Sequence, residues 1–423
     1  MLAVSRVRRL VSSELLISPA LHPRIAASTC RRANASCQPP WSPDDAERLL
    51  RRCDRLTKFL GRLRWPKQTH FIFQRQLHLP VRASNSFAGA NQERVSQRQL
   101  EYMAGFFDGD GCASAVTGLG GVKLSIGQSA DRAEVIMMFH RAFGGGIGFT
   151  TRGMGLAKPM IEWRVCGQAA RSAAANLAAI SSMKQPQLKI VADWPADASR
   201  RSEMALELKR LKGNPPEPNQ IECTWAYLAG FFDAEGCISI DPRTAHRRLE
   251  LSQIHAAPLL AIRNFLADKL PNLTNSVRLK GPAYYSFING AASTEAVLTN
   301  MLAAGPVVKR KAAKIALALT PATHLRVRAR IAQLAGNQCR HYRLDVDGMH
   351  RSKHILLVYS RLRNKGVPSD EAMALKQELA TLRAEHIFCK AKTRYSMLRV
   401  DIRTLLNQGA SHPGKLLLQT LWP

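Results

Sequence analysis

The sequence predicts an α+β fold made of two pseudo-symmetric units, each with the element order αββαββα. A short motif occurs twice, as MAGFFDGDG in residues 103–111 and as LAGFFDAEG in residues 228–236, at an offset of 125 residues. Strand-like stretches follow each copy, and after the second copy apolar and polar residues alternate, as expected of a half-buried strand. A proline-rich stretch at 213–222 separates the two copies. Together these features indicate one duplicated and fused domain, because the repeat is far longer than that of a solenoid.

The composition indicates a polyanionic partner. The chain has 423 residues, with 61 basic and 31 acidic side chains and a formal charge of +30. Such a charge favours binding to nucleic acid or to an anionic surface. No apolar run reaches the roughly 18 residues that a membrane-spanning helix needs, so no membrane partner is expected. The nine cysteines are scattered without a CxxC pair, which is typical of reduced thiols.

The predicted organisation has six parts. They are a targeting or disordered segment at 1–43, a basic helix and linker at 44–95 (helix at 44–64, linker at 65–95), a first domain at 96–212, a proline-rich linker at 213–222, a second domain at 223–320 and a basic, partly helical extension at 321–423. The first segment is rich in arginine and serine and has one acid, which is typical of a mitochondrial or chloroplast transit peptide. A disordered basic tail is the alternative.

Each domain is expected to begin with its motif helix, for which Ser96 is a plausible N-cap in the first copy. The elements predicted next are a strand at 112–116 and 237–241, a strand at 122–128 and 249–254, a helix at 132–143 and 258–269, a strand at 161–166 and 284–289, and a helix at 169–182 and 291–303. The element order also requires one further short strand in each copy.

Small residues form a stripe along each motif helix. Gly105 and Gly109 lie four residues apart in the first copy, as do Ala226, Gly230 and Ala234 in the second, so each set occupies one helix face. Glycine inside a helix costs about 1 kcal/mol relative to alanine. Close packing of the two motif helices against each other would compensate, with the neighbouring phenylalanines pointing into separate cores.

Each motif helix is expected to end in an acid. Asp110 and Glu235 lie at helix C-termini, where the macrodipole disfavours an anion by roughly 0.3–1 kcal/mol. Gly111 and Gly236, which follow, suit left-handed C-caps. If the helices are parallel, the two carboxylates meet and require a cation between them. Mg²⁺, or Mn²⁺ in its place, suits such oxygen ligands.

The acid one turn earlier in each helix has a different expected role. Asp108 and Asp233 are predicted to hydrogen-bond local backbone and steady the helix ends, without a part in catalysis.

The two nonapeptides resemble the LAGLIDADG motif of homing endonucleases of the single-chain, two-motif type. The resemblance covers roughly residues 97–320. It implies that the last acid of each motif, Asp110 and Glu235, binds the catalytic divalent metal ions. It also implies that polar residues at equivalent positions surround the metals, namely Gln128, Gln253, Lys184 and Lys309.

Double-stranded DNA would lie across the outward faces of the sheets. Ile238 and Ile240 are expected to face the core, so that Ser239 and Asp241 face the other way. The predicted DNA contacts are Ser114, Lys123, Ser239, Asp241, Arg243, Arg247 and Arg248. The first hairpin carries fewer charges than the second, which implies a non-palindromic target.

The resemblance implies a site-specific endonuclease that hydrolyses double-stranded DNA with a divalent metal, one strand for each motif acid, as a monomer with an internal pseudo-dimer. Two alternatives stay open: an intron RNA maturase of the same fold, with intron RNA as its partner, and a non-catalytic DNA-binding derivative. An organelle, the nucleus or another DNA-containing compartment would suit such a protein.

Overall fold

The computed structural model describes residues 42–82, 95–116, 121–180, 182–214, 217, 220–241, 246–273, 275–334, 341, 343–364 and 366–413. The predicted targeting segment, apart from its last two residues, lies outside the described residues. Across the described residues, no helix is both long and apolar enough to cross a membrane.

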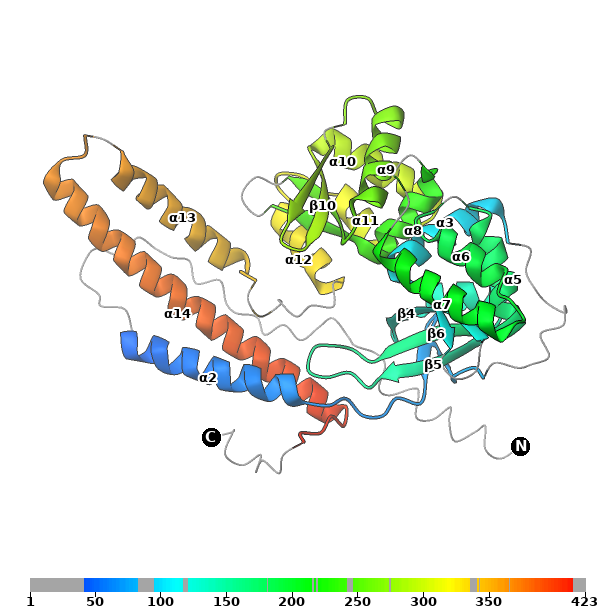
Figure 1. Cartoon of the computed structure of the whole chain (residues 1–423). Helices are drawn as coiled ribbons and strands as arrows, with labels where there is room; N and C mark the ends of the chain where they lie inside the picture. Colours follow the sequence, from blue (N-terminus) through cyan, green and yellow to red (C-terminus); the bar gives the residue numbers. More distant parts are fainter. Residues whose placement is uncertain are drawn as a thin grey trace. The chain divides into compact units, whose positions relative to one another are not determined.

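The core is α+β and contains two units with the same element order (Figure 1). The first unit consists of α3 (Gln97–Asp110), β3 (Gly111–Val116), β4 (Gly121–Ser129), α4 (Glu134–Phe143), β5 (Gly146–Thr151), β6 (Met160–Cys166) and α5 (Gly167–Ala178). The second consists of α8 (Trp225–Glu235), β7 (Gly236–Ile240), β8 (Arg247–Gln253), α9 (Ala256–Lys269), β9 (Asn275–Lys280), β10 (Ala283–Asn289) and α10 (Ala291–Ala304). The predicted αββαββα order is confirmed, and β5 and β9 are the short strands that it requires.

Both sheets are antiparallel and have the same topology. The strand orders are β3-β4-β6-β5 and β7-β8-β10-β9. On β4, Val122, Leu124 and Ile126 are buried beneath the helices, and Leu249 and Leu251 are buried on β8. Because side chains alternate along a strand, the intervening residues of both strands point to the opposite, outward face.

The two motif helices pack directly against each other, as predicted. A Cβ atom built on Gly105 would lie 2.0 Å from the carbonyl oxygen of Tyr227, and one on Gly230 would lie 1.9 Å from that of Tyr102. A Cβ on Gly109 would lie 2.4 Å from the Cβ of Ala234. These contacts run in the same order along both helices, so α3 and α8 are parallel and their C-termini lie side by side.

The helix starts are also joined. Ser96 and Gln99 form a capping box at the start of α3, and Thr224 caps α8 through the N–H of Tyr227. The Thr224 hydroxyl also donates to Glu101 of α3 at 2.8 Å. The two helices are therefore tied at their N-termini as well as along their length.

The expectation of two separate cores was wrong. Phe106, Phe107, Phe231 and Phe232 are all buried, and they belong to one hydrophobic cluster that includes residues of both units. The glycine stripe explains this result. It brings the helix backbones into contact, so that the apolar side chains on either side of the seam touch one another.

Helices beyond the seven elements of each unit complete the structure, and the 125-residue offset also relates two of them, at 185–192 and 310–317. These helices are α6 (Gln185–Ala192), α7 (Ala198–Gly213), α11 (Arg310–Leu317), α12 (His324–Leu334), α13 (Val346–Arg363), α14 (Ser369–Asn407) and, near the start of the chain, α2 (Pro43–Arg62). Packing of the second unit continues past its predicted end at residue 320, because Val327 of α12 is buried against Ile240 and Ile315.

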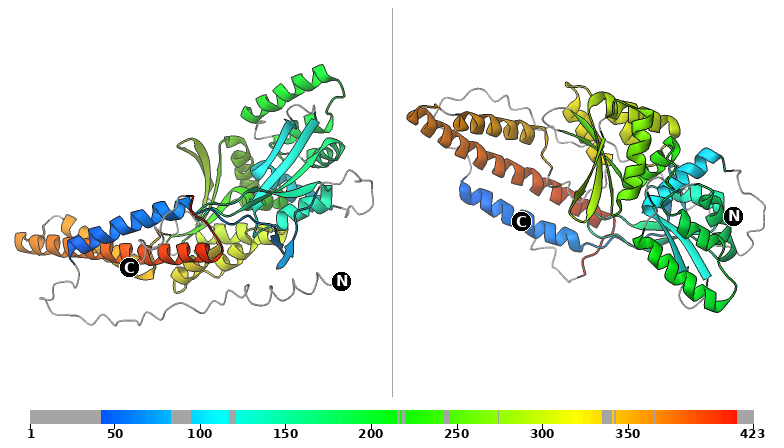
Figure 2. Two further views of the ribbon diagram at one scale, coloured as in Figure 1. Left: turned by 90° about the horizontal axis from the view of Figure 1, so that it is seen from below. Right: turned by 45° about the horizontal axis from the view of Figure 1, so that its top comes forward.

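The helix predicted at 44–64 is α2, and it packs along α14 from the opposite end of the sequence (Figures 1 and 2). Cys53 and Leu60 of α2, with Leu63 just after it, pack against Leu398 and Ile402 of α14 in a small hydrophobic cluster that is separate from the main core. The two basic extensions therefore form one helical appendage.

The linker expected at 65–95 contains a hairpin instead. Strands β1 (Phe71–Phe73) and β2 (Gln76–His78) pair with each other, and Phe71 and Phe73 are buried in the main core. Two apolar residues are too few to give a period in the sequence, so this anchor is visible only through its packing.

Candidate active site at the paired helix ends

The two motif acids converge where the parallel helices end. Asp110 is the last residue of α3 and Glu235 the last of α8. A Cβ on Gly109 would lie 3.1 Å from the Cγ of Glu235, so the second acid reaches across to the first helix. The structure therefore brings together the two residues that the sequence singles out as metal ligands.

The environment disfavours the ionised form of both carboxyl groups. Asp110 is an exposed residue, yet partial desolvation by the surrounding protein raises its pKa, against the opposing effect of Lys309 and Lys184. Partial burial raises the pKa of Glu235, and the charge of Asp110 raises it further. Two mutually repelling carboxylates at the negative poles of two helices attract a cation.

The glycines after the acids do not adopt the expected left-handed conformation. Gly111 has φ −81° and Gly236 has φ −78°, and each directly starts a strand. Close contacts, rather than backbone conformation, exclude a side chain at these two positions. A Cβ would lie 2.4 Å from the Phe107 ring at the first position and 2.3 Å from the Phe232 ring at the second.

Lys184 and Lys309 lie beneath the acids and bind the helix ends. The Nζ of Lys184 donates to the carbonyl oxygens of Phe107 at 2.8 Å and Gly111 at 2.6 Å. The Nζ of Lys309 donates to those of Phe232 at 2.8 Å, Asp233 at 2.5 Å and Ala234 at 3.4 Å. Each ammonium group thus neutralises the negative pole of a motif helix.

Burial lowers the pKa of both lysines, while nearby acids oppose the shift. Each lysine interacts electrostatically with both motif acids. The two cations therefore act on the acid pair as a unit, and each also lies over a phenylalanine ring of its own motif helix.

Asp108 and Asp233 are buried, and their partners are not the local backbone that the sequence suggested. Asp108 accepts the N–H groups of Met183 at 2.7 Å and Lys184 at 2.9 Å. Asp233 accepts those of Val307 at 2.6 Å, Val308 at 2.8 Å and Lys309 at 2.8 Å. Each aspartate therefore fixes the segment that carries the lysine of its own unit.

A tyrosine from the opposite motif helix completes each aspartate site. The hydroxyl of Tyr102 in α3 donates to Asp233 at 2.7 Å, and that of Tyr227 in α8 donates to Asp108 at 2.6 Å. Both tyrosines are buried. Each lysine is consequently positioned by an aspartate of its own unit and a tyrosine of the other unit.

Sequence reasoning missed these tyrosines, although a signal was available. Tyr102 and Tyr227 are separated by the repeat offset of 125 residues, as are Asp108 and Asp233. Searching the repeat for identical polar residues would have found both pairs.

The two glutamines lie at the ends of equivalent strands, β4 and β8. In each, the side-chain oxygen accepts the N–H of the following residue, at 3.2 Å for Gln128 and 2.8 Å for Gln253. The Nε2 of Gln253 also donates to Glu235 at 3.5 Å. The structure thus places Gln253 against a motif acid, whereas the contact that it gives for Gln128 is local.

The donor set fits a divalent cation. Asp108 and Asp233 are buried and accept backbone N–H and tyrosine donors, so Asp110 and Glu235 are the two carboxylates left to hold a metal ion. Among the described residues, no group of three or more His, Cys, Asp or Glu side chains forms a ready-made metal cage. Mg²⁺ requires no such cage, because one or two carboxylates together with waters and substrate phosphates are enough to bind it.

A cavity of about 260 Å³ opens beside this constellation. Its lining comes from both units and includes Asp108, Lys184, Lys212, Gln253 and His255. The lining also includes Gly109 and Gly111, the chain neighbours of Asp110, but neither Asp110 nor Glu235 itself.

Equivalent polar pairs lie on the outward faces of the two sheets. Ser114 pairs with Lys123 across β3 and β4, and Ser239 pairs with Arg248 across β7 and β8. The repeat offset of 125 relates both members of each pair. The outward faces thus present a hydroxyl beside a cation at the same place in each unit.

The prediction that Arg247 contacts DNA was wrong. Its side chain is 4 % exposed, and its guanidinium donates to the carbonyl oxygens of Ala316 and Ala291 and to Glu295. Arg247 occupies the place of buried Val122 in the repeat, so the strand's alternation turns it inward.

Two other predicted contacts have a different status. Asp241 lies just after β7, where its N–H donates to the carbonyl oxygen of His246 at 2.9 Å, and it is partly buried near Arg328. Arg243 lies outside the described residues. Lys123 and Arg248 therefore remain as the described cations of the predicted contact set.

No protein-family model matches the sequence, and no curated protein matches it. In structure the chain is similar to I-SmaMI bound to an uncleaved DNA target in the presence of calcium ions, with 15% identity, coverage of 56% of this chain and 98% of that one, and a TM-score of 0.39. It is also similar to the LAGLIDADG homing endonuclease I-GzeII in complex with its DNA target (13% identity, 57% and 99% coverage, TM-score 0.41). A third similar structure is the LAGLIDADG meganuclease I-AabMI bound to uncleaved DNA (14%, 57% and 99%, TM-score 0.37).

Proposed function

We propose that this protein is a LAGLIDADG-type endonuclease that cuts double-stranded DNA with the help of divalent metal ions, Mg²⁺ or Mn²⁺. The observation that carries the proposal is the convergence of Asp110 and Glu235 at the ends of two parallel helices, with a half-buried lysine hydrogen-bonded to each end. The charge of +30 supports a nucleic-acid partner.

In this proposal the residues of the site have distinct tasks. Asp110 and Glu235 hold the metal ions, which when bound activate a water and stabilise the leaving oxygen of a phosphodiester. Lys184 and Lys309 lower the electrostatic cost of keeping both carboxylates ionised. They also bring positive charge close to a phosphate bound above the acids.

The sheets supply the DNA-binding surface in this proposal. Lys123 and Arg248 lie on the outward faces and suit phosphate or guanine contacts. Because the hairpins of the two units carry different residues, the preferred target is a non-palindromic duplex.

The direct test is cleavage of a library of long duplexes by the full chain in Mg²⁺. The proposal expects the wild type to cut a subset of sequences. Asp110→Asn and Glu235→Gln should retain binding and lose cutting by at least about a hundredfold, because loss of even an outer-shell partner of a metal ligand typically costs about 10–100-fold. Glu203→Gln, an exposed acid on α7, is the matched control and should cut like the wild type.

The rival functions predict different results in the same assay. Tight, salt-sensitive binding of duplex without cutting favours a non-catalytic DNA-binding protein. Preferential binding of structured RNA favours an intron maturase. Either result with the folded wild-type protein contradicts the proposed nuclease activity.

A further inference from the structure

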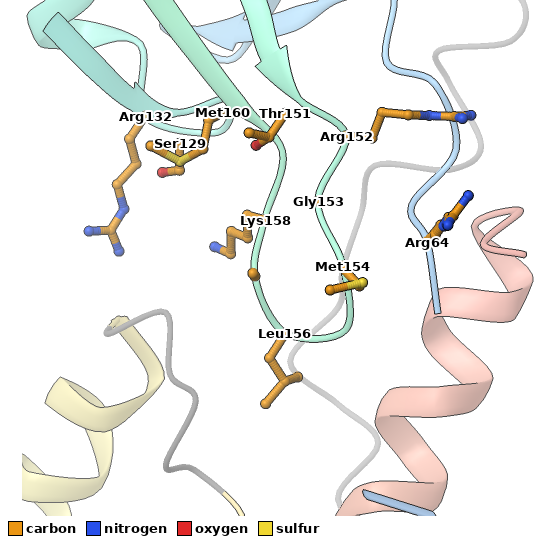
Figure 3. A pocket seen from close by; sticks show the side chains of 11 residues that line it. Arg64, Ser129, Arg132, Thr151, Arg152, Gly153, Met154, Leu156, Lys158 and Met160 are labelled. Carbon is orange, nitrogen blue, oxygen red and sulfur yellow. The ribbon is translucent and has the colours of Figure 1, made fainter. Parts of the chain in front are cut away.

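A second cavity, of about 750 Å³, lies outside the helix-end site and has a strongly basic lining. Most of its lining comes from the end of β5, the loop between β5 and β6, and the start of β6 (Figure 3). Four cationic side chains line it, namely Arg64, Arg132, Arg152 and Lys158, and its described lining contains no acid. Figure 3 shows Arg132 and Lys158 on one side of the loop, and Arg64 and Arg152 on the other.

The cavity continues the outward face of the first sheet. Ser129, Met160 and Thr151 line it and form one row across β4, β6 and β5, since Ser129 pairs with Met160 and Met160 with Thr151. Ser129 lies six residues after Lys123 on β4, so the two side chains point to the same, outward face of the sheet. Ser129 also lies three residues beyond Ile126, the partner of Gly111, a separation of about 10 Å along an antiparallel strand. A duplex placed over Lys123 and the motif acids would therefore pass close to this cavity.

One lining residue of the cavity, Arg64, comes from the terminal extensions. Arg64 exchanges two backbone hydrogen bonds with Ser411, both of 2.9 Å. The N–H of Gly155 donates to Leu63 at 2.8 Å, and the indole of Trp65 donates to the carbonyl oxygen of Gly155 at 2.9 Å. The loop is thus held by the appendage of α2 and α14, and Arg64 is brought against Met154, which lies 90 residues later in the chain.

Two of the four cations are committed to protein partners. Lys158 forms an ion pair with Asp131 at 2.6 Å, and Arg132 donates to the carbonyl oxygen of Leu334 at the end of α12. Arg64 and Arg152 are exposed, and within the described part of the chain neither forms an ion pair. These two guanidinium groups are available to an external anion.

The second unit has no equivalent loop. There β9 and β10 are joined by the two-residue turn of Gly281 and Pro282, whereas residues 152–159 join β5 and β6. The cavity is therefore a feature of the first unit alone, and any ligand of it makes the two halves unequal.

We propose that Arg64 and Arg152 bind backbone phosphates of the DNA duplex that lies across the first sheet, so that the terminal appendage acts as an additional clamp on one half of the target. This inference rests on the proposed function. Arginine binds phosphate through two parallel hydrogen bonds, and such contacts fix the position of a protein on DNA without reading sequence. The clamp thus adds affinity and orientation rather than sequence preference.

The test compares two double variants of the full chain with the wild type. Arg64→Ala/Arg152→Ala removes the available guanidinium groups but leaves the backbone pairing of Arg64 intact. Arg263→Ala/Lys269→Ala removes the same charge from exposed positions on α9, which covers the core side of the second sheet. The melting temperature of each variant is measured first, and the single variant Arg152→Gln provides a milder change.

Binding to a duplex selected from a library is measured over a range of KCl concentrations. Each lost phosphate contact should reduce the slope of log Kd against log salt by about 0.9. The Arg64/Arg152 variant should lose about one to two units of slope, Arg152→Gln about one, and the α9 control none. Ethylation of individual phosphates should identify one or two positions, all in one half-site, that matter for the wild type and not for the Arg64/Arg152 variant.

An unchanged slope and an unchanged ethylation pattern in the Arg64/Arg152 variant overturn the clamp and leave the proposed nuclease function standing. A variant that loses affinity only for structured RNA overturns the assignment to DNA. Failure of the wild type to bind any duplex overturns the clamp and the proposed function together.

Discussion

At the scale of single residues, the site combines groups that the fold itself disfavours. Partial burial and the neighbouring Asp110 raise the pKa of Glu235, so the ionised carboxylate is less favourable in the folded chain than in the unfolded chain. A carboxyl group with a raised pKa makes its full contribution to stability at low pH. That contribution is lost as the pH rises through the folded-state value. At neutral pH this acid therefore lowers the free energy of unfolding.

A first prediction concerns Glu235→Gln. The metal-free variant should melt a few degrees higher than the metal-free wild type at neutral pH, because the repulsion with Asp110 is gone. Its activity should be lost. Differential scanning calorimetry with a chelator present measures the effect, and Glu203→Gln serves as the control. A melting temperature below that of the wild type contradicts the electrostatic account of the pair.

A second prediction concerns pH. Metal binding requires ionised carboxylates, and the pKa values of Asp110 and Glu235 are both raised. Affinity for Mn²⁺ should therefore increase with pH through a region above the ordinary carboxylate range of about 4, and should then level off. Titrations at successive pH values measure this dependence. Lys309→Met should move the rise to higher pH, because Lys309 lowers both values; a curve at the same pH in both proteins counts against that role.

At the scale of elements, the crossed tyrosines couple the two units. Tyr102 of α3 reaches the aspartate that positions Lys309, and Tyr227 of α8 reaches the one that positions Lys184. The packing of the motif helices and the placement of the lysines are therefore parts of one arrangement.

A third prediction follows for Tyr102→Phe and Tyr227→Phe. Each removes one donor to a buried carboxylate, which costs about 1–3 kcal/mol of stability. Beyond this shared loss of stability, Tyr102→Phe should disturb the placement of Lys309 and Tyr227→Phe that of Lys184. The two variants should therefore slow cleavage of opposite DNA strands. Strand-resolved kinetics on end-labelled duplex provide the measurement, with Tyr359→Phe, an exposed tyrosine on α13, as the control. Equal slowing of both strands by both variants would indicate a purely structural role.

A fourth prediction concerns the seam between the motif helices. Gly105→Ala places a methyl group 2.0 Å from a backbone oxygen of the partner helix, and the helices must move apart. Overpacking of this kind costs about 1–3 kcal/mol or more. Gly61→Ala in α2 is the control, because nothing lies within 4 Å of its added Cβ, and it should not destabilise the protein. Urea unfolding of both variants compares them, and equal midpoints would argue against a close-packed seam.

At the scale of the whole molecule, the sequence predicts what the repeat encodes. The duplicated units, the glycine seam and the pairing of Asp110 with Glu235 all follow from the 125-residue offset and from helical spacing. Contacts between segments that lie far apart in the chain do not follow from such patterns. The β1–β2 hairpin in the core and the docking of Arg64 on the β5–β6 loop belong to this class, whereas the repeat offset marks the tyrosines and aspartates but not which of them pair.

Arg247 shows a second limit of sequence reasoning. A cluster of basic residues near a hairpin suggests an exposed surface, but the register of β8 turns this one side chain into the core. The repeat does indicate that position 247 is buried, because Val122 occupies the equivalent position in the first unit and is apolar.

The most direct measurement of the central claim is Mn²⁺ binding by the full chain, followed by electron paramagnetic resonance in the wild type and in Asp110→Asn, Glu235→Gln and the double variant. If both acids hold the same metal ions between the helix ends, each single variant should lose most of the bound Mn²⁺, and the double variant should lose little more. Undiminished binding in either single variant, or losses that simply add in the double variant, would contradict a shared site.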